Sequence, residues 1–509
     1  MKYKIIISSI FLVGSVTSCT KLDETLRDNV TFEQATKIVD PVALLKSSYD
    51  GLNDAYVNQD NVWALSEFPT DEAIPPSRGK DWDDNGVWRV LHTQTWDADN
   101  AKMLSSFNAL LKIVYNASNT LNFNPPAGIA AEAKFLRAFA MFSVVDLFGQ
   151  VPYRVPGSAL LKAPDVLTAA QALDTIIAQV TAILPQLPDG PAIKANKDAA
   201  RVLLMKCYLN RGTFLNRETP TFAAADMSKV ISLADEIKAS TRNYVLTTNF
   251  YDNFAPKNDI LSKENIFTLD DGPGKTGTRT GNKVLKNWHA SMHYNQKPSG
   301  WNGFTTLAEL YDKFEPIDQR IGAAYPGVTD VVGTRVGLLI GQQFNQTGAK
   351  LKDGLGNDLV FTKAVTLIAS GATLETSGIR VVKYPPDLVN DNDDADNDFV
   401  FYRYADVLLM KAEAILRGGT GTGALALVNE VRARAKATPL LAVTLNTILD
   451  ERAREFYWES YRRLDNQRFG RFLAAYSEKP TVSDKKYLLY PIPNNALAVN
   501  PNLKQNPGY

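Results

Sequence analysis

The chain has 509 residues, of which 45% are hydrophobic and 22% charged, the composition of a globular protein large enough to bury an extensive core. Its 55 basic residues balance 55 acidic ones, so the formal net charge is zero. Because nucleic acids and anionic lipid surfaces are recognised by basic patches, this balance argues against a nucleic-acid partner and against polybasic membrane binding.

The first twenty residues have the order of an export signal. Lys2 and Lys4 precede an apolar run, residues 5–16, that is too short to span a bilayer comfortably. The run ends in Val16-Thr-Ser-Cys19, which resembles a bacterial lipoprotein signal, in which small residues precede a Cys that is acylated. We expect residues 1–18 to be removed and Cys19 to carry acyl chains such as palmitate. The alternative is a plain secretory signal with an incidental Cys.

The second cysteine, Cys207, lies in an apolar helical pattern, ARVLLMKCYLN. If Cys19 is acylated, Cys207 is the one remaining thiol, and a mature chain cannot form an internal disulfide. We expect a buried, inert thiol rather than a nucleophile.

Apolar residues at spacings of three and four predict a series of helices. Those in the first half are expected at residues 41–60, 101–123, 129–148, 168–184, 198–211 and 223–239. After a middle region of loops and short strand-like runs (GLLIG, LVFTKAV and IRVVKY), helices return at 401–417, 424–435 and 445–472. The turn-rich tail, residues 488–509, is expected to wrap as an ordered strap.

Repeated helix pairs favour a tetratricopeptide-like array, although the usual motif letters of that repeat are absent. The sequence therefore predicts a mainly α fold, a tetratricopeptide-like helical-repeat scaffold with a loop-rich, partly β ligand-binding face. We place an N-terminal helical region at residues 19–240 and a C-terminal region, with the loop and strand insertions, at 241–509.

Residues 62–96 stand out because they contain four of the seven Trp residues, at positions 63, 82, 88 and 96. Pro and Gly interrupt the segment, so no helical or strand period runs through it. Ring faces beside carboxylates and an arginine suit a sugar, whose C–H faces stack on rings and whose hydroxyls need donors and acceptors. The alternative is that the Trp side chains fill the core.

Six stretches in order resemble the SusD/RagB family of glycan-binding outer-membrane lipoproteins. They are Cys19, TDEAIPPSRGKDWDDNGVWRVLHTQTW from Thr70, AEAKFLRAFAMFSVVDLFGQVPY from Ala131, FYRYADVLLMKAEA from Phe401, ERAREFYWESYRRLDNQRFG from Glu451, and the closing YPIPNNALAVNPNLKQNPGY. The resemblance implies a lipid-anchored protein on the outer surface of the outer membrane. It also implies that the chain captures an oligosaccharide or polysaccharide and passes it, uncleaved, to a SusC-like TonB-dependent transporter.

The resemblance also gives expectations for the binding site. The matching loop places Asp71, Arg78, Trp96 and Asn100 near the family's ligand face. From residue type and location we add Trp82, and from the middle loops Trp288, Tyr294 and Trp301. We expect the aromatic residues of the two loops to form one curved platform for several sugar rings.

Two other function classes remain open. In the helix near residue 455, Glu455 and Glu459 flank Trp458, and two carboxylates near a Trp could serve a surface glycan hydrolase. We favour an inter-helix charge network, in which Glu455 finds its arginine on another helix. A peptide- or protein-binding scaffold is the third possibility, because the repeats alone would permit it.

Metal and cofactor signals are weak. His289 and His293 are four residues apart, but the residues between them are not those of a zinc protease. The acidic run at residues 391–398 could offer oxygen ligands to Ca²⁺, with Asp270, Asp271, Asp391 and Asp393 as the candidates. A solvated acidic turn explains the run as well, so we expect no catalytic residue, no metal and no cofactor.

Overall fold

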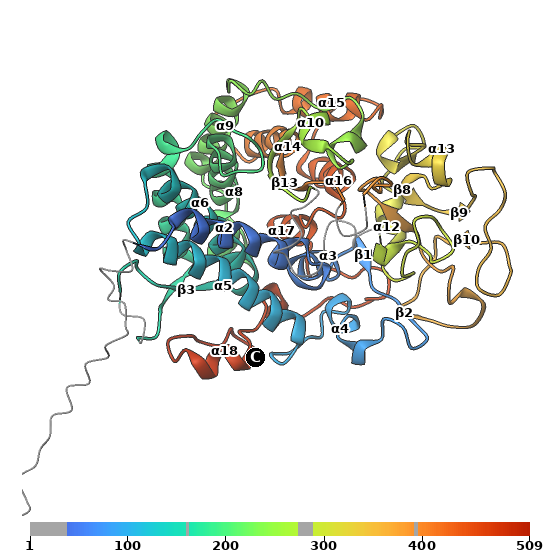
Figure 1. Cartoon of the computed structure of the whole chain (residues 1–509), viewed down its shortest axis with the longest axis horizontal. Helices are drawn as coiled ribbons and strands as arrows, with labels where there is room; N and C mark the ends of the chain where they lie inside the picture. Colours follow the sequence, from blue (N-terminus) through green and yellow to red (C-terminus); the bar gives the residue numbers. More distant parts are fainter. Residues whose placement is uncertain (1–37, 159–161, 273–288, 391–394) are drawn as a thin grey trace, which may run out of the picture. The chain divides into compact units, whose positions relative to one another are not determined.

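Helices dominate the computed structural model, which describes residues 38–158, 162–272, 289–390 and 395–509 (Figure 1). Cys19 and the signal segment lie outside the described residues. The helices are α2 (Pro41–Leu52), α3 (Ala64–Glu67), α4 (Arg89–His92), α5 (Ala101–Asn122), α6 (Ala127–Phe148), α7 (Ala169–Ile183), α8 (Lys197–Leu215), α9 (Ala224–Lys238), α10 (Asn258–Leu261), α12 (Ala308–Tyr311), α13 (Thr329–Val332), α14 (Tyr404–Leu416), α15 (Ala424–Arg434), α16 (Leu445–Phe456), α17 (Arg462–Arg468) and α18 (Asn494–Val499).

The long helices pack in chain order, each against the next. Helix α2 packs on α5, α5 on α6, α6 on α7, α7 on α8 and α8 on α9; α14 then packs on α9, α15 and α16. This sequential stacking is that of a helical-repeat scaffold, so the predicted fold class is confirmed. Because α9 packs directly on α14, the region boundary that we expect near residue 240 lies inside one unit, residues 40–509.

Local signals explain where several helices begin and end. The Asn100 side chain caps α5 by accepting from the Lys102 N–H at 2.9 Å. Thr168 and Gln171 form a capping box at the start of α7. Helix α6 ends at Gly149, whose φ of 74° few other residues adopt.

The strands are short, and in the described ranges no sheet has more than three of them. They are β1 (Ala73–Ile74), β2 (Ser77–Arg78), β3 (Gln150–Tyr153), β4 (Asp165–Thr168), β5 (Asn265–Leu269), β6 (Thr305–Thr306), β7 (Gly322–Ala323), β8 (Val336–Leu339), β9 (Gly341–Gln342), β10 (Val360–Phe361), β11 (Ile368–Ala369), β12 (Arg380–Val382) and β13 (Phe399–Arg403). In Figure 1, α12, α13 and β8 to β10 lie on the opposite side from α6, α8 and α9.

Two of the predicted helices in the C-terminal half differ from the structure. Residues 401–403 are not helical, because they belong to β13, which pairs with β5 in the core. The helix expected over 445–472 is two helices, since Trp458 and Ser460 adopt positive φ angles of 61° and 66° between α16 and α17. Neither residue is a glycine, so the sequence carries no signal for this break.

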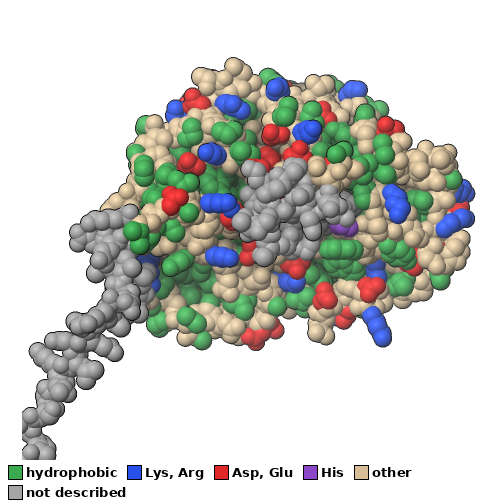
Figure 2. Space-filling view, viewed as in Figure 1, with side chains coloured by type: hydrophobic (Ala, Val, Ile, Leu, Met, Phe, Trp, Pro, Cys, Tyr) green, Lys and Arg blue, Asp and Glu red, His purple; other side chains and the backbone are tan. Residues whose placement is uncertain are grey.

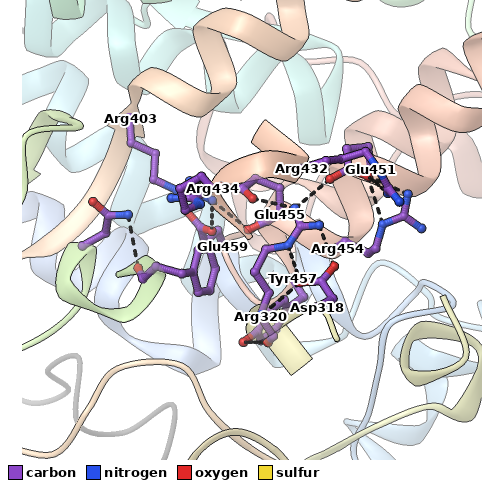
Figure 3. Close-up of polar contacts among 12 residues, drawn as sticks. Asp318, Arg320, Arg403, Arg432, Arg434, Glu451, Arg454, Glu455, Tyr457 and Glu459 are labelled. Carbon is purple, nitrogen blue, oxygen red and sulfur yellow. Dashed lines mark hydrogen bonds and ion pairs between the residues drawn. The ribbon is translucent and has the colours of Figure 1, made fainter. Parts of the chain in front are cut away.

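A buried network of charges ties the C-terminal helices together (Figure 3). Arg403, at the start of α14, contacts Glu264 at 2.6 Å and Glu459 at 2.8 Å, while Arg320 contacts Glu455 on α16 at 2.8 Å. Burial opposes ionisation of Glu455, but Arg434, Arg403 and Arg320 hold its pKa well below the usual value. Since buried ions are tolerated only when they are paired, the network fixes the relative positions of α14, α15 and α16.

A buried pair of carboxyl groups holds the break between α16 and α17. Glu72 accepts from the N–H of Trp458 at 2.5 Å, and Glu67 accepts from that of Ser460 at 2.6 Å. Burial raises the pKa of Glu67 well above its usual value, and the adjacent Glu72 raises it further. Burial therefore favours the protonated form of Glu67, and together the pair holds two non-glycine residues in left-handed conformations.

Candidate functional site

Two strand pairings bring together loops that are more than 200 residues apart in sequence. Strand β1 pairs antiparallel with β6, matching Ala73 with Thr306, and β2 pairs parallel with β11. The loop after β2 therefore lies beside the loop before β6. These are the two segments that supply the predicted aromatic platform.

Trp82 and Trp301 meet where these loops adjoin. Their ring centroids are 6.3 Å apart with the planes tilted by 39°, and Trp82 Nε1 donates to the Trp301 carbonyl at 3.2 Å. The Trp82 ring also packs on Phe304 at 4.6 Å, which joins it to the core. Trp82 is half-buried, and 45% of Trp301 is exposed.

Backbone conformation makes this contact possible. Trp82 has a φ of 61°, which is rare for a bulky residue and marks a position held by its surroundings. Gly303 leaves the necessary room, because a Cβ there would lie 2.4 Å from Cε2 of the Trp82 ring.

Two buried arginines lie beneath the loops. Arg78 donates to the carbonyls of Gly303, Leu374 and Ser377 at 2.8–3.2 Å. Arg380 donates to the side-chain oxygen of Asn302 and to the Glu375 carbonyl, both at 2.8 Å. Because each guanidinium joins several segments through carbonyl oxygens, the pair fixes the loop that carries Trp301 to the loop at 374–378.

His289 and Tyr294 complete an aromatic surface, which we define as Trp82, His289, Tyr294 and Trp301. The His289 ring stacks on Trp301 at 5.1 Å with the planes only 17° apart. Tyr294 is 41% exposed and packs on the buried His293 ring at 3.9 Å. Exposed rings of this kind offer apolar faces to a ligand, and the loops around them carry hydrogen-bonding groups.

Charged groups surround this surface without one sign prevailing. Lys80 and Asp81 are exposed beside Trp82, and Asp83 forms an ion pair with Arg89. Figure 2 shows basic and acidic side chains interspersed over the coloured part of the face in view. The surroundings agree with a ligand that is bound by stacking and hydrogen bonds rather than by charge alone.

The family model of the SusD family matches residues 263–509. That part of the chain belongs to the SusD family. The resemblance predicted from the motifs is confirmed. The match contains β13, the helices α14 to α17 and the loop that carries Tyr294 and Trp301.

Among curated proteins, the chain is similar to a starch-binding protein SusD of Bacteroides thetaiotaomicron, with 29% identity over 74% of this chain and 72% of that protein. It is also similar to a SusD-like protein P2 of Formosa agariphila, with 24% identity over 84% and 82% of the two chains. The first is named a binding protein, which agrees with our prediction that the chain is not an enzyme.

Solved structures share the fold. A SusD superfamily protein from Parabacteroides distasonis has a TM-score of 0.70 at 19% identity, covering 94% of this chain and all (100%) of that one. A surface glycan-binding protein A from Bacteroides thetaiotaomicron, in complex with laminarihexaose, has a TM-score of 0.66 at 18% identity and covers 92% of this chain and 98% of that one. These similarities show the SusD-family fold.

Two of the predicted ligand residues are structural in this chain. Trp96 is 2% exposed, packs on Tyr487 and Tyr490, and donates its Nε1–H to the Tyr509 hydroxyl at 2.8 Å. Asn100 is 8% exposed, and both the nitrogen and the oxygen of its side-chain amide are hydrogen-bonded to backbone groups. The expectation that these side chains face a ligand is wrong, because neither has a free face or a free polar atom pointing outward.

Asp71 and Arg78 also differ from the expectation of open ligand contacts. Asp71 accepts from Arg462 at 2.7 and 2.5 Å and from Asn466 at 2.9 Å, and it lines a separate cavity of about 360 Å³. Arg78 is 4% exposed, and its donors are taken by carbonyls. Asp71 therefore lies in a different hollow, while Arg78 supports the aromatic surface from below.

The aromatic residues of the two loops lie in different parts of the structure. Trp82 and Trp301 contact each other and Tyr294 lies on the loop that carries Trp301, while the role of all three in binding stays a prediction. Trp288 lies outside the described residues. Trp63 and Trp88 fill the core, where the alternative reading of this segment placed them.

No metal site emerges from the part of the chain that the structure describes, where no three His, Cys, Asp or Glu side chains could hold an ion. Asp391 and Asp393 lie outside that part. Asp270 is half-buried and Asp271 buried, and the Asp271 N–H donates to Asp398. His293 faces Glu375 rather than His289, because its Nε2 lies 3.1 Å from that carboxylate.

The acid pair of the hydrolase alternative is part of the core network. Glu455 and Glu459 are 0% and 8% exposed, and both contact Arg403. Both carboxylates are buried and paired with arginines of the core network, so neither is placed as a free acid or base beside a glycosidic bond. The predicted inter-helix network is confirmed.

Sequence reasoning missed Arg380, Gly303 and Glu375. Each acts through a long-range contact: Arg380 on the Trp301 loop, Gly303 on the Trp82 ring and Glu375 on Tyr294. No local pattern marks such residues. One signal was available, since glycines in the stretch PSGWNGF could have indicated close packing around Trp301.

Proposed function

We propose that this chain binds oligosaccharides on the aromatic surface of Trp82, His289, Tyr294 and Trp301, without cleaving them. The observation that carries the proposal is the convergence of two remote loops to present Trp82 and Trp301 beside each other, with 45% of Trp301 and 41% of Tyr294 exposed. Leaving large rings in contact with water lowers solubility, so such a cluster marks a binding surface.

The names of relatives support this class of ligand. The curated relative from Bacteroides thetaiotaomicron is named as starch-binding, and two structural neighbours are named for laminarin binding or solved with laminarihexaose. These ligands are those of the relatives. For the present chain they support a glycan, and the identity of its sugar is a question for binding measurements.

Anchoring and delivery complete the proposal. Cys19 would carry acyl chains that hold the chain at the outer face of the outer membrane, where it would pass its glycan to a SusC-like TonB-dependent transporter. In the described parts of the chain, no helix is long and apolar enough to cross a bilayer. The family match and the Cys19 signal are the support for both steps.

The expected affinity follows from the size of the surface. If each stacked sugar removes about 40 Å² of apolar area from water, the gain is roughly 1 kcal/mol per ring at ~25 cal/mol/Å². Hydrogen bonds add about 0.5–1.5 kcal/mol each. The surface should therefore prefer oligosaccharides to monosaccharides and bind them in the micromolar to millimolar range.

A glycan array followed by calorimetry on each hit tests the proposal. We expect saturable binding of at least one oligosaccharide, weaker binding of its monosaccharide and no cleavage product. Peptide libraries screened in parallel test the scaffold alternative. Binding of peptides with no binding of glycans would overturn the proposal, and release of shorter sugars would overturn its non-catalytic part.

A further inference from the structure

Glu375 joins three separate contacts at the edge of the aromatic surface. Its carboxylate accepts from the Gly354 N–H at 2.6 Å, lies 3.1 Å from Nε2 of His293 and bonds the Tyr294 hydroxyl. Its side chain is 21% exposed. The carboxylate therefore connects the segment of Tyr294 with the loop between β9 and β10.

The protonation state of His293 is set by its neighbours. Its Nδ1 accepts from the Asn295 N–H at 3.0 Å, so Nε2 carries the hydrogen and donates it to Glu375. Burial lowers the pKa of His293 to about 4, so the ring is neutral near pH 7. The His293 ring is 0% exposed. Its plane is tilted by 35° from that of the Tyr294 ring, and it packs against one face of that ring.

Hydrogen bonds favour the ionised form of Glu375. Burial opposes ionisation, but hydrogen bonds from Tyr294, Gly354 and His293 lower the pKa of the carboxyl below its usual value. The buried cations Arg380 and Arg78 lie close enough to His293 to oppose its protonation. Glu375 is thus a permanent acceptor at neutral pH.

Little space remains around the Tyr294 hydroxyl. A Cβ on Gly354 would lie 2.7 Å from the Tyr294 hydroxyl and 2.7 Å from Oε1 of Glu375. Asn295 makes a second hydrogen bond between the same two segments, because its Nδ2 donates to the Lys352 carbonyl at 2.9 Å. Tyr294 is therefore held at its face by His293 and at its tip by Glu375.

We propose that Glu375 is a positioning residue of the glycan surface, which fixes the orientation of the Tyr294 ring through its hydroxyl without touching the sugar. This inference rests on the proposed function. An exposed tyrosine without such a partner would sample several rotamers, and ordering it on binding would weaken the affinity. Fixing the ring beforehand removes that loss.

A double-mutant cycle tests this role, with affinity for a glycan identified on the array as the readout. Tyr294→Phe keeps the ring and removes the hydroxyl, and Glu375→Ala removes the acceptor. We expect each to weaken binding by about threefold, within the range for immobilising one side chain. Because both changes break the same contact, the double variant should also lose about threefold rather than ninefold.

Two further variants separate positioning from general destabilisation. Gly354→Ala should weaken binding like Glu375→Ala, because its new methyl group displaces the hydroxyl. Trp301→Ala combined with Glu375→Ala should multiply the two losses. Glu430→Ala, at an exposed position on α15, is the matched control and should bind as wild type. Circular dichroism confirms that each variant is folded.

The outcomes distinguish a failure of the proposed function from a failure of the positioning role of Glu375. A wild-type chain that binds no glycan defeats the proposed function and this inference with it. If the wild type binds but Glu375→Ala binds equally well, Glu375 has no positioning role and the proposed function stands. Multiplicative losses in the Tyr294→Phe, Glu375→Ala pair would also overturn the inference, because the two side chains would then act independently.

Discussion

At the scale of single residues, the exposed fraction of each indole ring separates core tryptophans from surface ones. Trp63, Trp88 and Trp96 donate to a carbonyl, a carboxylate and a hydroxyl within the fold and are at most 2% exposed. Trp301 is 45% exposed. Composition alone predicted that the loop at 62–96 matters, but it could not show which rings face outward, because burial depends on the packing of remote segments.

The burial of Trp96 gives the first prediction. Trp96→Ala should lower the free energy of unfolding by about 3–5 kcal/mol, the usual range for removing a large aromatic side chain from a core. Trp96→Phe keeps most of the packing and should cost less, mainly the hydrogen bond to Tyr509. Urea unfolding followed by circular dichroism measures both. A stable Trp96→Ala variant that had lost glycan affinity would show instead that this ring contacts the ligand.

The carboxyl pair of Glu67 and Glu72 predicts a pH dependence of stability. Burial raises the pKa of Glu72 from 4.5 to about 7, and it also raises the pKa of Glu67. The charged groups facing the pair are Arg462, Asp71 and Lys383. Between pH 4.5 and 7 the folded chain holds protons that the unfolded chain has released, so the free energy of unfolding should fall as pH rises through this window.

Glu67→Gln tests that dependence, because the amide imitates the protonated acid. It should keep the contact to Ser460 and reduce the fall in stability with pH, while Glu430→Gln on the surface should change neither. Urea titrations at several pH values between 4.5 and 8 provide the measurement. An unchanged pH slope in Glu67→Gln would mean that other groups cause the titration.

At the scale of elements, the long helices were predictable and the site was not. The 3.6-residue period located α5, α6 and α7 to within a few residues, because each helix buries one apolar face. The strands β1 and β6 have only two residues each, and their pairing depends on segments more than 200 residues apart. No local pattern specifies such a pairing, and the aromatic surface depends on it.

Gly303 provides a prediction for the docking of the two loops. In Gly303→Ala the new methyl group would lie 2.4 Å from the Trp82 ring, so the ring must leave its place. We expect near-ultraviolet circular dichroism to change and glycan affinity to fall as far as in Trp82→Ala. Gly128→Ala, in α6 with nothing within 4 Å, is the matched control. Full affinity in Gly303→Ala would show that Trp82 does not contribute to binding.

At the scale of the whole molecule, the proposed anchor connects binding to uptake. If Cys19 is acylated, the chain should partition into the outer membrane, and Cys19→Ala should release it in soluble form. Mass spectrometry of the N-terminal peptide from native membranes identifies the modification directly. An unmodified, soluble wild-type chain would contradict the lipoprotein assignment and leave the glycan surface unaffected.

The central claim, that the surface of Trp82 and Trp301 binds glycans, is tested most directly by calorimetry. The ligand is an oligosaccharide found on the array, titrated into wild type and Trp301→Ala, with circular dichroism as the folding control. Removing one stacked ring should cost about 1 kcal/mol, so we predict roughly fivefold weaker binding by a variant that remains folded. A folded Trp301→Ala variant that binds as tightly as wild type would contradict the assignment of the site.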